Sequence, residues 1–252
     1  MKYMGGKYFL GKELSEIMKQ YVKPEEVTGY VEPFCGALSV LMHMNNEYTC
    51  NASDNHPDLI QLWTEVQDGS FKPPTQMNEK IYLECKDLKS PNALKGFVGF
   101  GLSFGGKFFS GYADKYRNNK NENFLQEALN SLEKIKPKLK GVKFKCISYD
   151  KLRPSKKLIY CDPPYQKTKH PIKYRRDVKH YDEFDNERFW DVMRKWSKDN
   201  YVFISETSAP DDFIPVWEKK SHRSASQSDK TRYKNKSESY QIEKLYIHKD
   251  LN

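Results

Sequence analysis

The sequence GYVEPFCG at residues 29–36 places a short apolar run directly before a tight turn that contains Pro33 and Gly36. This pattern predicts a buried strand that ends in a turn, and the run 37–44 beyond it has the character of a helix. A second predicted strand, 48–53, ends in Asp54, and another helix opens a few residues later. The alternation of strand and helix predicts an α/β fold with a parallel sheet covered on both faces.

The same alternation returns in the second half of the chain. Residues 158–161 and 201–204 are short apolar runs of the kind that form buried strands, and apolar residues at helical spacing lie between them. Asp185 stands where the N-cap of that helix is expected. Near the N-terminus, apolar residues at helical spacing over 10–21 predict one more helix.

The segment 70–145 differs from the sequence on either side. It contains two successive prolines, many amides and lysines, and a Gly/Phe-rich stretch at 96–111, with one clear helix that Pro137 ends. We therefore predict an inserted, mainly helical subdomain at 70–145 and a main domain formed by 1–69 and 146–252.

The composition excludes several classes of protein. The chain has 252 residues, with 43 Lys and Arg against 34 Asp and Glu, so its net charge of +9 favours a polyanionic partner. No apolar run reaches the roughly 20 residues that cross a bilayer, and the N-terminus lacks the apolar stretch of a signal peptide. We therefore expect a cytoplasmic protein without membrane association. The five cysteines form no C-x-x-C pair, so neither a disulfide framework nor a metal site is expected.

Two features at predicted strand ends favour a nucleotide-like ligand, because ligands of parallel α/β sheets bind at the carboxyl ends of the strands. The Gly36 turn is followed eighteen residues later by Asp54. A glycine turn with an acid about 20 residues further on can hold a nucleotide whose ribose hydroxyls donate to the carboxylate. The sequence has no G-x-G-x-x-G, so an ordinary turn glycine and strand-end aspartate explain this spacing equally well.

The tetrapeptide Asp162-Pro163-Pro164-Tyr165 follows the predicted strand 158–161. Two successive prolines remove two N–H donors, so the turn presents carbonyl oxygens and a carboxylate beside an aromatic ring. This suits a planar base with an exocyclic amine, which would donate to Asp162 and to the Pro163 carbonyl while Tyr165 stacks on the ring. Both acceptors localise the lone pair of the nitrogen, so the amine becomes a usable nucleophile.

With these motifs the chain resembles the Dam-type adenine-N6-specific DNA methyltransferases of bacteria and their phages. The matching motifs are YMGGK at 3–7, VEPFCG at 31–36, ASD at 52–54 with DLI at 58–60, SYD at 148–150 and YCDPPY at 160–165. Their order, with a recognition insert between the cofactor turn and the Asp-Pro-Pro-Tyr motif, is similar to the alpha arrangement of amino-methyltransferases. The resemblance implies a Rossmann-like methyltransferase sheet, with 70–145 as the target-recognition subdomain.

The resemblance also implies the cofactor. S-adenosylmethionine would be converted to S-adenosylhomocysteine without a metal, because its sulfonium methyl group is already activated. Tyr3 and Lys7 would line the cofactor and active-site side, Asp54 would accept from the ribose hydroxyls, and Tyr149 would lie near the adenine of the cofactor. The implied cofactor-binding residues are Tyr3, Lys7, Phe34, Gly36, Asp54, Tyr149 and Asp162.

The implied catalytic residues are Asp162, Pro163 and Tyr165. Asp162 would face both the methionine end of the cofactor and the target amine. The target adenine would have to leave the duplex to reach these groups, so the resemblance implies base flipping.

The predicted insert departs from the pattern of relatives that read GATC, which carry an Asn/Arg-rich hairpin ending in Pro-Phe-Gly. This chain has LSFGGKFFSG at 102–111, and no arginine precedes Arg117. Arginine to guanine is the commonest specific contact in the major groove, so we predict no recognition sequence. Lys107 is expected to contact a phosphate rather than a base.

Two basic stretches are expected to contact the DNA backbone, although solvated charge is the alternative. Six Lys and Arg lie at 167–179 and seven at 219–236, whereas 27–62 contains none. The nucleic-acid-binding candidates are Lys107, Arg117, Lys173, Arg175, Arg176, Lys230 and Arg232.

The expected function is sequence-specific transfer of a methyl group to the N6 amine of a flipped adenine in double-stranded DNA. Cytosine-N4 methylation uses the same amine chemistry and stays open, as does a DNA-binding protein that kept the fold and lost catalysis. We expect a monomer or a weak dimer on DNA, in the cytoplasm of a bacterium or a phage-infected host. Housekeeping methylation, a restriction-modification partnership and phage self-protection are all compatible with the sequence.

Overall fold

The structure of the chain is a computed structural model that describes residues 1–113, 123–164, 184–222 and 240–251. It divides into two compact units, Met1–Arg153 and Pro154–Asn252. Each unit is built from strands and covering helices, so the predicted α/β class is confirmed.

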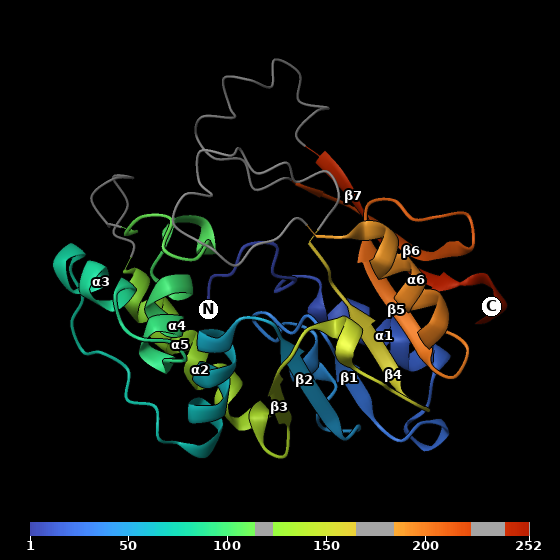
Figure 1. Cartoon of the computed structure of the whole chain (residues 1–252), viewed down its shortest axis with the longest axis horizontal. Helices are drawn as coiled ribbons and strands as arrows, with labels where there is room; N and C mark the ends of the chain where they lie inside the picture. The colour runs from blue at the N-terminus through green and yellow to red at the C-terminus, as the bar shows by residue number, and fades with distance from the viewer. Residues whose placement is uncertain (114–122, 165–183, 223–239, 252) are drawn as a thin grey trace. The chain divides into compact units, whose positions relative to one another are not determined.

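Among the described residues of the first unit, parallel strands follow the order β3-β2-β1 (Figure 1). They are β1 (Tyr30–Glu32), β2 (Cys50–Asp54) and β3 (Lys143–Cys146). Every residue of β1 is buried, whereas β3 is largely exposed, as its place at the end of the strand order explains. Because the strands are parallel, the residues that follow β1, β2 and β3 lie at one edge.

Two of the predicted helices form with the apolar faces that their spacing predicts, and α2 (Pro57–Asp68) packs on β2 and β3. Helix α1 (Gly11–Tyr21) buries Leu14 and Met18, and α2 buries Leu59, Leu62 and Trp63. Helix α2 begins with a proline, which has no N–H to leave unsatisfied, and ends at a left-handed glycine. Short 3-10 turns complete this part of the unit at Pro24–Glu26 (η1) and Tyr149–Lys151 (η5).

The prediction of a helix at 37–44 is wrong. This segment contains only a short 3-10 turn, η2 (Leu41–His43). Leu38 has a φ of +59°, in the left-handed region that a helix excludes, and its N–H donates to the Cys35 carbonyl in a tight turn at 2.7 Å. Its side chain is fully buried, so core packing holds a conformation that a leucine rarely adopts.

The segment predicted as an insert is mainly helical, and α3, α4 and α5 gather beside α2 in Figure 1. The elements are α3 (Glu79–Lys86), α4 (Ala93–Gly101), η3 (Phe104–Gly106), α5 (Phe124–Ile135) and η4 (Lys136–Leu139). The first six residues of the Gly/Phe-rich stretch, 96–101, therefore form the end of a helix, α4, and all six are buried. At Gly96 a Cβ atom would lie 2.3 Å from the carbonyl oxygen of Asp58, so the glycine permits α4 to pack directly on the start of α2.

In the described part of the second unit the strands follow the order β4-β5-β7-β6. The predicted pair β4 (Leu158–Cys161) and β5 (Tyr201–Glu206) is parallel, and α6 (Asn186–Trp196) connects the two strands. The side chain of Asp185 accepts a hydrogen bond from the backbone N–H of Arg188 at 3.0 Å, which confirms the predicted N-cap.

The expectation of a purely parallel sheet is wrong at this end of the chain. Strand β7 (Tyr240–His248) is antiparallel to β5, and β6 (Phe213–His222) is antiparallel to β7. Lys219 and Lys220, assigned from the sequence to a basic stretch, belong to β6. The lysines obscured the strand signal, because an outer strand needs only one apolar face and tolerates charge on the other. A last 3-10 turn, η8 (Lys249–Leu251), follows β7.

Candidate functional site

The Gly36 turn after β1 is held by hydrogen bonds to the end of β2 and to α2. The Gly36 N–H donates to Oδ2 of Asp54 at 3.2 Å, and its carbonyl accepts from the indole N–H of Trp63 at 2.9 Å. The N–H of Cys35 donates to the Ser53 carbonyl at 2.9 Å. Gly36 has a φ of +44°, which glycine adopts without strain. The turn is thus preformed, with both polar groups of its glycine satisfied.

Asp54 lies at the carboxyl end of β2 and is nearly enclosed, with 9% of its surface exposed. Its Oδ1 accepts from the His56 N–H at 3.0 Å and its Oδ2 from Gly36. Burial raises the pKa of this carboxyl above its ordinary value, and the backbone N–H groups of His56, Gly36 and Asn55 oppose that rise. A carboxylate offers about four acceptor positions. Asp54 therefore keeps capacity for a hydroxyl donor after its backbone bonds are made.

An aromatic pair lies at the same edge of the first unit. The rings of Phe34, after β1, and Tyr149, after β3, are 5.1 Å apart and tilted by 34°. Tyr149 is buried and Phe34 is half-buried. Flat aromatic surfaces of this kind suit the face of a planar heterocycle.

The N-terminal segment brings Tyr3 to the Gly36 turn. A Cβ atom on Gly36 would lie 2.9 Å from Cε1 of Tyr3, so this position has no room for a side chain while the ring is there. On its other side the Tyr3 ring is 5.0 Å from the ring of Phe100. Lys7, in the same segment, is only 7% exposed, and its Nζ donates to the Gly5 carbonyl at 3.0 Å. The first unit therefore brings Tyr3, Gly36 and Asp54 into one cluster, as the sequence implied.

The second unit carries the Asp-Pro-Pro turn. Asp162 is half-buried directly after β4, Pro163 is buried and Pro164 is exposed. Strand β4 is fixed beneath them by the hydrogen bond between the Tyr160 and Ser205 hydroxyls, 2.8 Å long. Tyr165 lies outside the described residues.

Sequence reasoning missed Glu206, which ends β5 as Asp54 ends β2. In the register of the two strands Cys161 lies opposite Ile204, so Asp162 and Glu206 follow neighbouring parallel strands at one edge. Glu206 is 2% exposed, and its Oε1 accepts from the N–H and the hydroxyl of Thr207 at 2.6 and 3.0 Å. The available signal was an acid two residues after the apolar run 201–204, similar to the pattern that marked Asp54 and Asp162.

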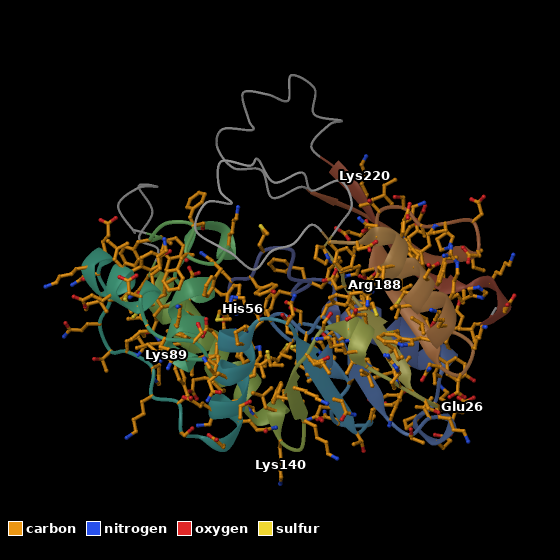
Figure 2. All side chains as sticks on the ribbon, in the orientation of Figure 1. Glu26, His56, Lys89, Lys140, Arg188 and Lys220 are labelled. Atoms are coloured by element: carbon orange, nitrogen blue, oxygen red, sulfur yellow. The ribbon has the colours of Figure 1, made fainter. Side chains whose placement is uncertain are left out.

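His56 was also missed, and it joins Asp54 to the predicted insert. Its ring stands edge-on to Phe100 at 4.9 Å and to Phe108 at 4.4 Å (His56 is labelled in Figure 2). Burial lowers the pKa of this imidazole to about 4, so the ring is neutral at physiological pH. Its Nδ1 is buried without a hydrogen-bond partner among the described residues. The aromatic contacts of His56 could not be read from sequence, because both phenylalanines lie more than 40 residues away.

Of the nucleic-acid candidates, the structure describes only Lys107. It is half-buried directly after η3. Arg117, Lys173, Arg175, Arg176, Lys230 and Arg232 lie outside the described residues.

A further basic run escaped the sequence analysis. Residues 134–153 contain eight Lys and Arg against one Asp, a net charge of +7. Lys143 and Lys145 are exposed on β3, the terminal strand, where lysines oppose pairing with a second chain. Figure 2 shows Lys140, at the approach to β3, on the far side of the first unit from His56. The net charge of the chain is therefore not confined to the two stretches identified from sequence.

The five cysteines are free thiols, and only Cys146 is exposed. Over the described ranges, no group of three or more His, Cys, Asp or Glu side chains could hold a metal ion. Among the same residues, no helix is both long and apolar enough to cross a membrane.

Parallel strands with a glycine turn after β1, an acid after β2 and a further acid after β4 define an α/β protein of the Rossmann-like methyltransferase class. The model of the D12 class N6 adenine-specific DNA methyltransferases matches residues 3–92 and 96–245, and the chain belongs to this family. No curated protein matches the chain. The protein is accordingly an enzyme that transfers a methyl group from S-adenosylmethionine to the N6 amine of adenine in DNA.

Proposed function

We propose that the enzyme methylates a flipped adenine at a specific sequence in double-stranded DNA, with Asp162 as the residue that activates the amine. The observation that carries this proposal is the Asp162-Pro163-Pro164 turn at the end of a buried parallel strand, half-buried and without proline N–H groups. Membership of the adenine-specific family removes the support for cytosine as the target base.

The residues of the first unit fit an adenosine-containing cofactor. Asp54 has acceptor capacity for the ribose hydroxyls, and the Phe34 and Tyr149 rings offer faces for an adenine. Gly36 permits the Tyr3 ring to pack against the turn, where a Cβ atom would lie 2.9 Å from that ring. Tyr3 and Lys7 complete this set. S-adenosylmethionine supplies an electrophilic methyl group on a positively charged sulfur.

Asp162 and Pro163 act on the nucleophile. The amine of the flipped adenine would donate one N–H to the Asp162 carboxylate and one to the Pro163 carbonyl, which localises the lone pair on N6. When N6 forms its new bond to carbon, it must lose one of its two protons, and the Asp162 carboxylate is the acceptor at that position. Tyr165 would stack on the flipped ring.

Recognition of the duplex is assigned to the subdomain at 70–145 and to the two basic stretches. Lys107 would contact a phosphate, as would Arg117 and the candidates at 173–176 and 230–232. The insert contains no arginine among its described residues, so base readout by arginine would fall to Arg117 or to residues outside the insert. The enzyme would act as a monomer or a weak dimer on DNA.

Substitution of Asp162 tests the proposal. Asp162→Ala should abolish methyl transfer to DNA while DNA affinity stays within a few-fold, because the carboxylate acts on the amine and not on the phosphates. Transfer of a labelled methyl group measures activity, and fluorescence anisotropy with the same DNA measures binding. The matched control is Asp191→Ala, an exposed aspartate of α6 in the same unit, which should retain wild-type transfer. Retained turnover in Asp162→Ala contradicts the proposed role.

The target site comes from a separate measurement. Sequencing of modified bases in genomic DNA, after expression in a host without its own methylation, reports the base and its context together. Methylated adenines at one recurring sequence are expected. Modified cytosine, or no modification from a folded enzyme, contradicts the proposed function.

A further inference from the structure

In the N-terminal turn that leads into α1, a charged side chain is buried and two aromatic side chains are exposed. Lys7 is 7% exposed, whereas the next two residues, Tyr8 and Phe9, are 56% and 92% exposed. Stability favours the opposite arrangement, because a buried ammonium loses hydration and an exposed phenyl ring loses its burial. Lys7 belongs to the proposed cofactor set, but nothing in that set explains why Tyr8 and Phe9 face outward.

Backbone hydrogen bonds and close packing hold the turn that carries Tyr8 and Phe9. The N–H groups of Leu10 and Gly11 both donate to the Lys7 carbonyl, at 2.9 and 2.6 Å. A Cβ atom at Gly11 would lie 2.0 Å from the carbonyl oxygen of Ser39, so the start of α1 packs directly on that backbone. The Tyr8 and Phe9 rings meet edge to face at 5.3 Å. Both rings are therefore presented outward by an ordered turn.

Exposed apolar side chains also lie at Met4 and on the predicted insert. The N–H of Met4 donates to the Gly106 carbonyl at 3.1 Å, which ties the N-terminal segment to η3. Met4 and Phe104 are 44% and 51% exposed. Of the seven large apolar side chains exposed in the described part of the chain, four come from these two joined segments. We call Met4, Tyr8, Phe9 and Phe104 the apolar patch.

The charges in the segments that carry the apolar patch favour DNA as its partner. Residues 102–113 contain Lys107 and no acid, and residues 1–12 contain three lysines and no acid. Of these three, Lys2 pairs with Glu127, Lys12 pairs with Glu16 and Lys7 is buried, so of the lysines in both segments only Lys107 is proposed to contact a phosphate. Aromatic rings stack on the face of any base, and neighbouring lysines favour the phosphates. DNA is the substrate of the family, and the segment that carries Tyr8 and Phe9 also carries Tyr3 against the Gly36 turn.

We propose that Tyr8 and Phe9 form an aromatic wedge that stacks on bases of the DNA substrate. Proteins that unstack or flip bases commonly insert apolar side chains at the opened step, where they replace the lost stacking. This inference rests on the proposed flipping of adenine. In this role Tyr8 and Phe9 bind DNA by stacking on its bases and make no ionic contact with its phosphates.

Measurements of DNA affinity at several salt concentrations test the wedge. The probe is a duplex that carries the methylated site mapped in the host genome, with 2-aminopurine beside the target adenine. Phe9→Ala should weaken binding about 5- to 150-fold, the range for loss of one aromatic stack on a base. The slope of log affinity against log salt should not change, because no phosphate contact is lost. Phe9→Trp should retain the affinity and the change in 2-aminopurine fluorescence.

The matched control is Tyr21→Ala, an aromatic residue at the other end of α1 that is 40% exposed, and its DNA affinity should equal that of the wild type. Cofactor affinity and thermal stability of Phe9→Ala should also stay at wild-type values. Unchanged DNA affinity in the double variant Tyr8→Ala/Phe9→Ala overturns the wedge. So does a loss of affinity that follows a loss of cofactor binding or stability, since the turn would then be structural. Absence of methyl transfer by the wild type would instead contradict the proposed function.

Discussion

Two glycine turns of the first unit contact the same N-terminal segment, but different side chains stabilise the two turns. The Gly36 turn is held by polar bonds to Asp54 and Trp63 at strand and helix ends. The loop of the predicted insert that carries Gly106 is held by the Tyr82 hydroxyl, which is bonded to the Ser103 hydroxyl at 2.7 Å and accepts from the Gly111 N–H at 3.2 Å. The first turn is organised around a buried carboxylate and the second around an uncharged phenol hydroxyl.

The two turns also contact Tyr3 differently. At Gly36 a Cβ atom would meet the Tyr3 ring, whereas at Gly106 it would lie 2.5 Å from the backbone nitrogen of Tyr3. A ring can rotate away, but a backbone can move only with its whole segment. The Gly106 turn therefore fixes the position of the N-terminal segment, and the Gly36 turn fixes the orientation of one side chain.

The largest effect is expected for Gly106→Ala. The new Cβ would collide with the backbone of Tyr3 and its φ of +68° would be strained, so the free energy of unfolding should fall by about 2–4 kcal/mol. Gly105→Ala is the matched control, because Gly105 has a φ of +66° but nothing within 4 Å of its Cβ position. It should lose only about 1 kcal/mol. Equal losses in denaturant unfolding would show that Tyr3 does not pack on Gly106.

His56, which joins the two regions, should make stability depend on pH. Burial lowers its pKa to about 4, while Asp58 acts against that shift and Lys95 adds to it. As the pH falls from about 6.5 to about 4, the unfolded chain takes up a proton that the folded protein does not, so stability present above pH 6.5 is lost in this window. The expected loss is about 1–3 kcal/mol.

The variant His56→Phe provides the comparison for this pH dependence. Phenylalanine keeps an aromatic ring between Phe100 and Phe108 but cannot take up a proton. Unfolding titrations at pH 7.5 and pH 4.5 should show a smaller decrease in stability for the variant than for the wild type. The same decrease in both proteins would mean that His56 is not the group responsible.

The smallest effect on stability is expected for Gly36→Ala. The φ of +44° is strained for alanine and the Tyr3 ring must move, which together should cost about 1 kcal/mol. Cofactor binding should suffer more, by roughly tenfold, because the displaced ring and the new methyl group occupy the proposed cofactor side of the turn. Calorimetric titration with S-adenosylhomocysteine measures this loss, with Gly69→Ala as the control since nothing lies within 4 Å of its Cβ position. Wild-type affinity in Gly36→Ala would remove Gly36 from the cofactor set.

Much of the fold followed from local patterns. The helical spacing over 124–135 and 57–68 and the apolar runs at 30–32 and 158–161 all formed the predicted elements. Pairs such as Gly36 and Asp54 could be anticipated, because parallel strands bring their carboxyl ends to one edge whatever the details of packing. The roles assigned to the motif residues stay predictions.

Other features depended on contacts between distant parts of the chain. The run 37–44 has an apolar pattern suited to a helix, but packing of Leu38 in the core imposes a left-handed residue there. The helix at 93–101 was obscured by its glycines, which lower helix propensity but permit close contact with α2. Strand β6 pairs with β7, and β7 pairs in turn with β5, so these strands depend on distant partners, while the lysines of β6 obscured its local signal.

The sequence by itself determined the α/β class, the family motifs and the acids that end the parallel strands, because strand and helix periodicities and turn residues act over a few positions. Only the tertiary structure decided that Lys7 is buried while Tyr8 and Phe9 are exposed, and that His56 lies between Phe100 and Phe108. The side of a turn that meets solvent depends on what packs against its other side. Here Gly11 packs on Ser39, which is 28 residues away, and Met4 is bonded to Gly106, which is 102 residues away.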